Sequence, residues 1–342
     1  MMPEFLPETH HFYQLMDAFN ILFTSAGRRV ALIQSFKKVL SNIGLPGTIV
    51  TTDSQNNAPA AFAADVSELV PRITDANYIN ILLGICEKHQ IKLLISLIDP
   101  ELYLLSLHRQ EFAAKGVTLL VCSPETNEIC YDKRNTFKFF KEMGVPTPEL
   151  LDGDKILADT NACYPFLIKP AKGSCSVGVN QVRNAKELEF FREYIANAII
   201  QEFLIGEEYT LDILVDFQGK VRSVVPRLRI ETRAGEISKG ITVKNPALIE
   251  AGKKVAESLP GAIGCITVQC FLLASGEIKF IEINPRFGGG FPLAFQAGAN
   301  FPLWIIEMVL GKNLEIKIDD WQDGVVMLRY DEAFFVTKEM IE

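Results

Sequence analysis

The chain has 342 residues, and 34 lysines and arginines against 42 aspartates and glutamates give a net charge of −8 at pH 7. Its 48% of apolar residues can bury a large core, which excludes disorder as the main state. The acidic balance argues against a surface that binds nucleic acid or anionic membrane throughout, and no apolar run approaches the ~18 residues of a membrane span. At roughly 150 residues per domain, about two domains are expected.

The first 19 residues have neither a basic start nor an apolar stretch, so we interpret them as an N-terminal extension and not as a secretory signal. The seven cysteines form no C-x-x-C pair, and four histidines leave little for a zinc site. Buried, reduced thiols in a cytoplasmic protein fit this usage best.

Residues 20–122 alternate apolar strands with helical patterns. The predicted strands cover residues 20–25, 47–53, 92–99 and 117–122. Short apolar strands separated by helices predict a doubly wound parallel sheet covered on both faces, whose carboxyl edge binds ligands. Asp53 follows the second strand as a ribose-binding acid would, but the first turn, SAGRRV, lacks the G-x-G-x-x-G of a dinucleotide site. Gly27 then serves the tight turn.

Residues 123–342 change to an α+β pattern. Strands dominate this part of the chain, and their short turns predict that most of them are antiparallel. The predicted strands cover residues 166–169, 177–182, 198–204, 209–215, 220–230, 265–273 and 278–284. Helices are predicted after Asp132, after the capping box Asn184 to Glu187, and over residues 248–259 and 303–310.

The segment KPAKGSCSVGV is the first chemical signal. Lys169 ends a strand, and a glycine and serine loop from Gly173 to Ser176 precedes the next one. Converging backbone N–H groups and a lysine can bind phosphate oxygens. A solvated hairpin is the alternative.

The hairpin 265–284 is the second signal. A two-residue turn at Ser275-Gly276 would pair Leu273 with Ile278, Phe271 with Phe280 and Gln269 with Glu282, and would put Asn284 on the face of Glu282. A carboxylate with two amides suits Mg²⁺, which takes hard oxygen ligands and substrate phosphates. A structural ion pair of Glu282 with Arg286 is the alternative.

Two further stretches are weaker signals. Glu207 and Glu208 open a strand and could accept hydrogen bonds from ribose hydroxyls, or could lie at a solvated hairpin tip. The basic strand PRLRIETRAGEISKG indicates either an anion site or a solvated face. Its cations are Arg227, Arg229, Arg233 and Lys239.

Five motifs occur along the chain in the order DK, KPAxGSxSxGV, EFxxGEEYTxD, Q and ExNPR. With this ordered set the chain resembles the ATP-grasp superfamily, most closely the ATP-grasp module of the carbamoyl-phosphate synthetase large subunit. The resemblance covers about residues 20–311. The resemblance implies a pre-ATP-grasp domain at residues 20–122 and an ATP-grasp domain at residues 123–342, whose small lobe (about 157–203) and large lobe (about 204–342) close over ATP. For ATP, it implies phosphate contacts from Lys133 and Lys169 and a covering loop with Gly173, Ser174, Ser176 and Gly178. It further implies an adenine hinge at Glu202, Phe203 and Leu204, and a ribose contact by Glu208. For catalysis, it implies one or two Mg²⁺ ions (with Mn²⁺ as a substitute) on Gln269, Glu282 and Asn284, with Arg286 facing the phosphoryl group or the acceptor. Cys175 replaces a residue that is usually small or polar.

We therefore expect an ATP- and Mg²⁺-dependent carboxylate–amine ligase that forms an acyl phosphate, with Lys169 and Arg286 as catalytic residues. The alternatives are a module that phosphorylates bicarbonate or carbamate with a partner subunit, and a non-catalytic ATP sensor. The expected partners are small molecules, with neither nucleic acid nor membrane, and a homodimer is a family-level expectation. Residues 287–292, Gly27-Arg28 and Asp99 to Glu101 are expected to face the substrate, although Asp99 or Glu101 could simply start a helix.

Overall fold

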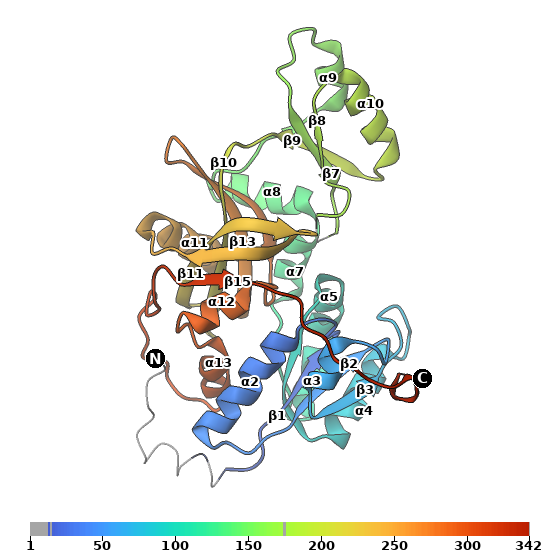
Figure 1. The fold of residues 1–342 in the computed structure, drawn as a ribbon, viewed down its shortest axis with the longest axis vertical. Helices are drawn as coiled ribbons and strands as arrows, with labels where there is room; N and C mark the ends of the chain where they lie inside the picture. The colour runs from blue at the N-terminus through green and yellow to red at the C-terminus, as the bar shows by residue number, and fades with distance from the viewer. Residues whose placement is uncertain (1–12, 14–15, 174–175, 342) are drawn as a thin grey trace.

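The computed structural model describes residue 13, residues 16–173 and residues 176–341. Most of the expected extension at residues 1–19, together with Ser174 and Cys175, lies outside these described residues. Three sheets form the architecture, and Figure 1 shows them one above another along the long axis of the molecule. None of the described helices is both long and apolar enough to cross a membrane.

The first sheet is parallel and confirms the predicted doubly wound domain. Its strands are β1 (Asn20–Thr24), β2 (Ile49–Asp53), β3 (Val66–Leu69), β4 (Ile91–Ser96) and β5 (Thr118–Leu119), in the order β3-β2-β1-β4-β5. Its helices are α2 (Val30–Ile43), α3 (Pro59–Ala63), α4 (Tyr78–Lys88), α5 (Asp99–Leu107) and α6 (Arg109–Ala114). The strand order reverses between β1 and β4, so the carboxyl ends of these two strands form the edge where such sheets bind ligands.

A small four-stranded sheet forms the distal end of the molecule, at the top of Figure 1. Helices α7 (Pro124–Tyr131) and α8 (Lys133–Glu142) lead into it. Its elements are β6 (Leu150–Leu151), α9 (Gly153–Ala158), β7 (Phe166–Pro170), β8 (Asn180–Val182), α10 (Ala185–Tyr194) and β9 (Ala198–Glu202), with antiparallel order β6-β9-β7-β8. A separate apolar cluster that includes Ile168, Val182 and Leu188 supports it.

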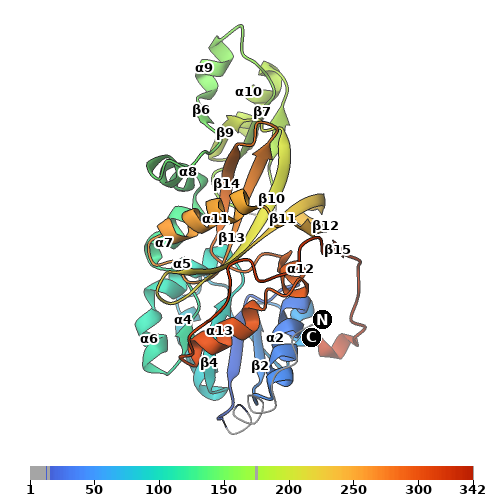
Figure 2. The same ribbon diagram turned by 90° about the vertical axis from the view of Figure 1, so that its left-hand side faces the viewer.

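The third sheet has six antiparallel strands and lies between the other two (Figures 1 and 2). Its strands are β10 (Gly206–Val215), β11 (Val221–Arg233), β12 (Glu236–Thr242), β13 (Gly264–Leu273), β14 (Ile278–Asn284) and β15 (Val326–Leu328), in the order β14-β13-β10-β11-β12-β15. Helices α11 (Pro246–Ser258) and α12 (Phe291–Gln296) contact this sheet, whereas α13 (Phe301–Val309) packs on α2. A short 3-10 helix, η1 (Lys338–Met340), follows near the C-terminus.

One apolar core joins the parallel-sheet domain to the six-stranded body. The rings of Phe36 on α2 and Phe287 lie 6.0 Å apart, and Phe287 packs in turn on Phe291 of α12 at 4.8 Å. Residues of both units belong to the same buried cluster. The parallel-sheet domain is therefore held against the body through α2, and Arg29, just before this helix, lines the cleft described next.

Candidate active site

A cleft of about 290 Å³ lies between strand β7 of the small sheet and the face of the six-stranded sheet, and it reaches the start of α2. Seven cationic side chains line it: Arg29, Lys133, Lys169, Lys172, Arg227, Arg229 and Arg286. Among the described residues, three carboxylates do so: Glu208, Glu236 and Glu282. Arg227 and Arg286 are paired with Asp212 and Asp99, which are not part of the lining, so a surplus of two positive charges remains. In a chain of net charge −8 this surplus favours an anionic ligand in the cleft.

Two cross-strand rows of side chains form the sheet face of the cleft. Direct pairing aligns Glu282, Gln269, Thr210 and Arg227 across β14, β13, β10 and β11. The neighbouring row runs through Asn284, Thr267 and Asp212. Because residues two apart on a strand share a face, both rows point the same way. The predicted pairing of Gln269 with Glu282 and the shared face of Glu282 and Asn284 are confirmed.

The register nearer the turn is not the predicted one. Leu272 and not Leu273 pairs with Ile278, and Phe280 pairs with Cys270, not with Phe271. The loop has three residues ending in Gly276 at φ 85°, with Leu273 N–H bonded to the Glu277 carbonyl. This is the usual three-residue hairpin with a left-handed glycine. A bulge at Ile281 restores the predicted register at Glu282, and Phe280 turns away from the cleft to pack on Phe140 of α8 at 5.8 Å.

Lys169 and Lys133 lie on the small-lobe side of the cleft. Lys169 on β7 is 5% exposed, and no described residue accepts a hydrogen bond from its ammonium group. Burial lowers the pKa of Lys169 to about 8, an effect that the carboxylates of Glu282 and Glu208 oppose and Lys133 reinforces. Lys133 starts α8 and donates a hydrogen bond of 2.7 Å to the Gly173 carbonyl.

The loop after Lys169 is placed only in part. Gly173 and Ser176 line the cleft, and both have left-handed backbone angles, with φ values of 112° and 56°. Gly178 does not line it; a Cβ added there would lie 3.0 Å from the Pro170 ring. Ser174 and Cys175 lie outside the described residues, so their predicted roles stay predictions.

Glu282, Gln269 and Asn284 line the opposite wall. The Glu282 carboxylate is half-buried, and no described residue donates a hydrogen bond to it. Gln269 Oε1 accepts from Arg229 at 3.1 Å, and Asn284 Oδ1 accepts from Arg286 at 3.2 Å. No group of three or more His, Cys, Asp or Glu residues with metal-ligand spacing occurs in the described part of the chain. One unpartnered carboxylate beside two amides fits a Mg²⁺ ion that keeps waters and substrate phosphates as its other ligands.

Glu208 lies at the cleft but is not free for a ligand in this structure. Arg229 Nη1 donates to its carboxylate at 2.7 Å, and burial is the main cause that raises the pKa of Glu208. The expected adenine hinge is also not in the cleft lining. Glu202 instead forms an ion pair of 2.5 Å with Lys279, and Phe203 is 36% exposed. The roles of Glu202, Phe203 and Leu204 therefore stay predictions.

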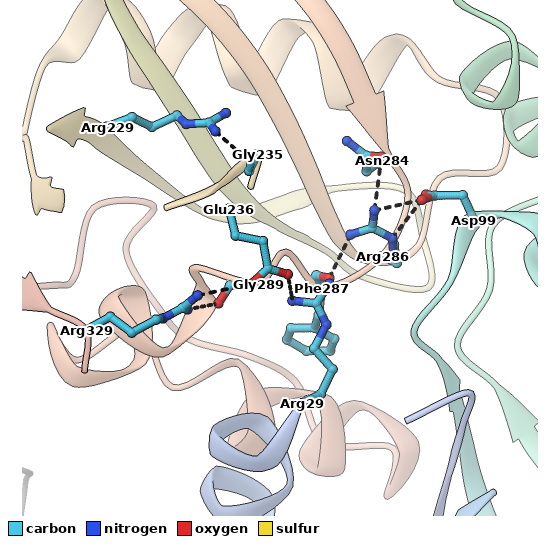
Figure 3. A network of polar contacts seen from close by, with 10 residues as sticks. All are labelled: Arg29, Asp99, Arg229, Gly235, Glu236, Asn284, Arg286, Phe287, Gly289 and Arg329. Atoms are coloured by element: carbon cyan, nitrogen blue, oxygen red, sulfur yellow. Dashed lines mark hydrogen bonds and ion pairs between the residues drawn. The ribbon is translucent and has the colours of Figure 1, made fainter. Parts of the chain in front are cut away.

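Arg286 connects the cleft to the parallel-sheet domain (Figure 3). Its Nη2 and Nε atoms lie 2.7 and 3.1 Å from Asp99 Oδ2, and its Nη1 donates to the Phe287 carbonyl at 3.1 Å. The partner that sequence reasoning offered, Glu282, is not the observed one. Asp99 both starts α5 and faces the cleft arginine. Glu101, by contrast, is fully buried at the β1/β4 edge, so its expected substrate-facing position is wrong.

Hydroxyl groups explain the burial of Glu101. Its carboxylate accepts hydrogen bonds from the side chains of Thr24, Ser25, Tyr78 and Ser96, at 2.9, 3.1, 2.5 and 2.7 Å. Burial raises the pKa of Glu101, while these four hydrogen bonds oppose that shift. The arrangement fixes the chain at the end of β1, where Ser25 has φ 51°, and so positions the turn that leads to Arg29.

The cleft also contains Arg29, which the sequence did not indicate as a site residue, and Arg227 and Arg229, for which an anion site and a solvated face were both possible. Arg29, before α2, lies 3.4 Å from Glu236 of β12, which also pairs with Arg329 at 3.1 Å (Figure 3). The basic strand divides into two halves. Arg227 and Arg229 line the cleft, whereas the exposed Arg233 and Lys239 pair with Asp331 and Glu231. The spacing of Arg227 and Arg229, two residues apart on one strand, indicated that both lie on the same face of the sheet. The sequence around Arg29 gave no indication that this residue would reach the cleft.

Two family models match this chain: "PylC-like, N-terminal domain" over residues 21–120 and "ATP-grasp domain" over residues 130–290. A D-alanine–D-alanine ligase of Fusobacterium nucleatum is 28% identical over 169 residues, which are 47% of this chain and 58% of that protein. A carbamoyl-phosphate synthase of Methanobrevibacter smithii is 25% identical over 245 residues, which are 66% and 64% of the two chains. The chain thus spans less than two thirds of the length of either relative.

Among solved structures, the biotin carboxylase domain of the Hydrogenobacter thermophilus 2-oxoglutarate carboxylase, in complex with MgADP, ADP and bicarbonate, superposes with a TM-score of 0.70. The alignment covers 91% of this chain and 74% of that chain at 18% identity, which establishes likeness of fold. The motif order, the three sheets and the matched models agree. The chain therefore carries an ATP-grasp domain at residues 130–290, preceded by a PylC-like N-terminal domain at residues 21–120.

Proposed function

We propose that this protein is an ATP- and Mg²⁺-dependent carboxylate–amine ligase. One observation carries the proposal: Lys169 and Lys133 of one lobe and the Glu282–Gln269–Asn284 group of the other line the same cationic cleft. The names of the relatives support the reaction class, since a D-alanine–D-alanine ligase is among them.

The proposed reaction has two steps. A carboxylate oxygen of the first substrate attacks the γ-phosphorus of ATP, the bond to the ADP oxygen breaks, and an acyl phosphate forms. An amine nitrogen then attacks the acyl carbon, inorganic phosphate leaves with the bonding electron pair, and the nitrogen loses a proton. Neither step needs a nucleophilic side chain, so the protein contributes positioning and charge.

The residues of the cleft have distinct tasks in this scheme. The ammonium groups of Lys133 and Lys169 offset negative charge on the phosphates, and the partly desolvated setting of Lys169 strengthens that interaction. Glu282, Asn284 and Gln269 would hold Mg²⁺, which supplies charge neutralisation at the phosphate oxygens when bound. Arg286, held by Asp99, presents its guanidinium group beside Asn284, where it can orient the transferred group.

A Glu282→Ala variant tests the proposal. It removes the unpartnered carboxylate and is expected to abolish amine-dependent release of ADP across a panel of carboxylate and amine pairs. The matched control is Glu277→Ala, which removes an exposed carboxylate at the tip of the same hairpin and is expected to leave turnover unchanged. Circular dichroism must show both variants folded. Retained turnover in Glu282→Ala would reject the metal assignment.

The same assay separates the alternative functions. ADP release stimulated by bicarbonate with no organic acid would favour a carbamoyl-phosphate synthetase-like module. Calorimetric binding of ATP with no turnover on any pair would favour a non-catalytic sensor. A homodimer and a cytoplasmic location are further proposals, to be checked by light scattering and by localisation of a tagged chain.

A further inference from the structure

A fully buried ion pair lies in the floor of the cleft, away from the groups used above. Arg227 of β11 and Asp212 of β10 are 1% and 0% exposed at their side chains. Arg227 Nε and Nη2 lie 2.6 and 3.1 Å from the two oxygens of Asp212. The carboxylate therefore takes one edge of the guanidinium group bidentately.

The remaining edge of Arg227 has no partner. Its Nη1 is buried, and no described residue accepts a hydrogen bond from it. Buried nitrogen donors without an acceptor are rare, because leaving one unsatisfied costs about 1–3 kcal/mol. Arg227 nevertheless contributes to the lining of the cleft. An arginine whose one edge is already held by Asp212 is thus preset to receive a second carboxylate on its other edge.

The glycine loop after Arg286 fits closely around this group. A Cβ added at Gly290 would lie 2.3 Å from Arg227 Nη1, and one added at Gly289 would lie 2.4 Å from Arg29 Nη1. Gly290 has an ordinary backbone, with φ −92°, so the backbone conformation does not require glycine there. Glycine is required at this position by the close contact with the Arg227 guanidinium group. We call Arg227, Gly289 and Gly290 the Arg227 subsite.

The Arg227 subsite is separate from the metal side of the cleft. Arg227 and Glu282 stand in one cross-strand row with two strands between them. Three steps of about 4.8 Å put their backbones roughly 14 Å apart. This separation suits an extended organic substrate that carries two anionic groups.

Resting on the proposed function, we propose that the Arg227 subsite binds a carboxylate of the organic substrate that is not the group phosphorylated. The substrate class is then an acid with a second, distant anionic group, such as a dicarboxylate or an amino acid extended by its side chain. Arg29 and Arg229, which pair with Glu236 and Glu208, line the same cleft. Arg227 is a specificity-determining residue in this scheme, while the reacting groups stay at Glu282 and Arg286.

Calorimetric titration of glutarate into the full chain saturated with ADP and Mg²⁺ tests the inference. Gly290→Ala places a methyl group against Arg227 Nη1 while keeping the Asp212 pair charged, so it perturbs the subsite without removing its cation. Loss of one charge-assisted hydrogen bond predicts about tenfold weaker glutarate binding. Arg227→Lys is expected to act in the same direction. Gly84→Ala, a helix position with no atom within 4 Å of the added Cβ, is the control and is expected to bind like wild type.

The outcomes separate this inference from the proposed function. Weaker glutarate binding in Gly290→Ala, with ADP affinity unchanged, supports the subsite. No glutarate binding in wild type, or equal binding in Gly290→Ala and Gly84→Ala, overturns it. Failure of the protein to bind ADP would instead count against the proposed function, and the glutarate comparison without nucleotide would still decide on the subsite.

Discussion

Replacement of Lys169 by methionine is expected to stabilise the protein while weakening its affinity for ATP. Lys169 is 5% exposed, and burial lowers the pKa of its ammonium group from 10.5 to about 8. At about 1.36 kcal/mol per pKa unit, keeping this group charged costs the folded state roughly 3 kcal/mol at neutral pH. Methionine is unbranched and similar in length, so Lys169→Met removes the cost without opening a large cavity.

The expected effect can be measured by urea and thermal unfolding at pH 7. The free energy of unfolding should rise by up to about 3 kcal/mol, or several degrees in Tm. The control is Lys172→Met. Lys172 is an exposed residue of the same loop, and its ammonium group lies 5.1 Å from the Tyr131 ring centre. Removing this ammonium group should change the free energy of unfolding by less than about 1 kcal/mol. Affinity for ATP in Lys169→Met should fall about tenfold or more, because a charged hydrogen-bond donor is lost.

The pH dependence has a defined sign. Because the pKa of Lys169 is lower in the folded than in the unfolded state, the unfolded state binds more protons between pH 8 and 10.5, and wild-type stability should rise with pH there. The advantage of Lys169→Met is therefore complete below about pH 8 and disappears towards pH 10.5. A Lys169→Met protein less stable than wild type at pH 7 would refute the reasoning, since it would mean that Glu208 and Glu282 stabilise the ammonium group more than burial destabilises it.

Two further predictions concern buried polar groups. Asp212→Leu leaves the Arg227 guanidinium group buried without a counter-charge, so the free energy of unfolding measured in urea should fall by about 3–5 kcal/mol. The double variant Asp212→Leu/Arg227→Met should recover most of that loss. Equal losses in the single and the double variant would contradict this view of the pair. Glu101→Leu removes the acceptor of four hydroxyl groups and should lower the free energy of unfolding by several kcal/mol. Glu101→Gln keeps one acceptor oxygen and should therefore be less destabilising. Identical Tm values for the two variants would contradict this prediction.

Local patterns in the sequence determined the element types and much of the site. Alternating apolar strands and helices predicted the parallel sheet, and period-two spacing put Glu282 and Asn284 on one face. The pairing of Gln269 with Glu282 could be predicted because a hairpin joins neighbours in the sequence. The register nearer the turn could not, because loop length and a bulge at Ile281 decide it.

Contacts between distant segments were decided by the tertiary structure alone. Asp99 pairs with Arg286 across 187 residues, and Arg29 meets Glu236 and the Gly289 loop only because α2 packs on α12 through a shared core. Likewise, the sequence places Arg227 on a basic strand but does not indicate that Asp212 takes one edge of its guanidinium group and leaves the other unpaired. Periodicity records which side of an element is buried, whereas the partner a charge meets depends on how whole layers pack, and that information is not local to any segment.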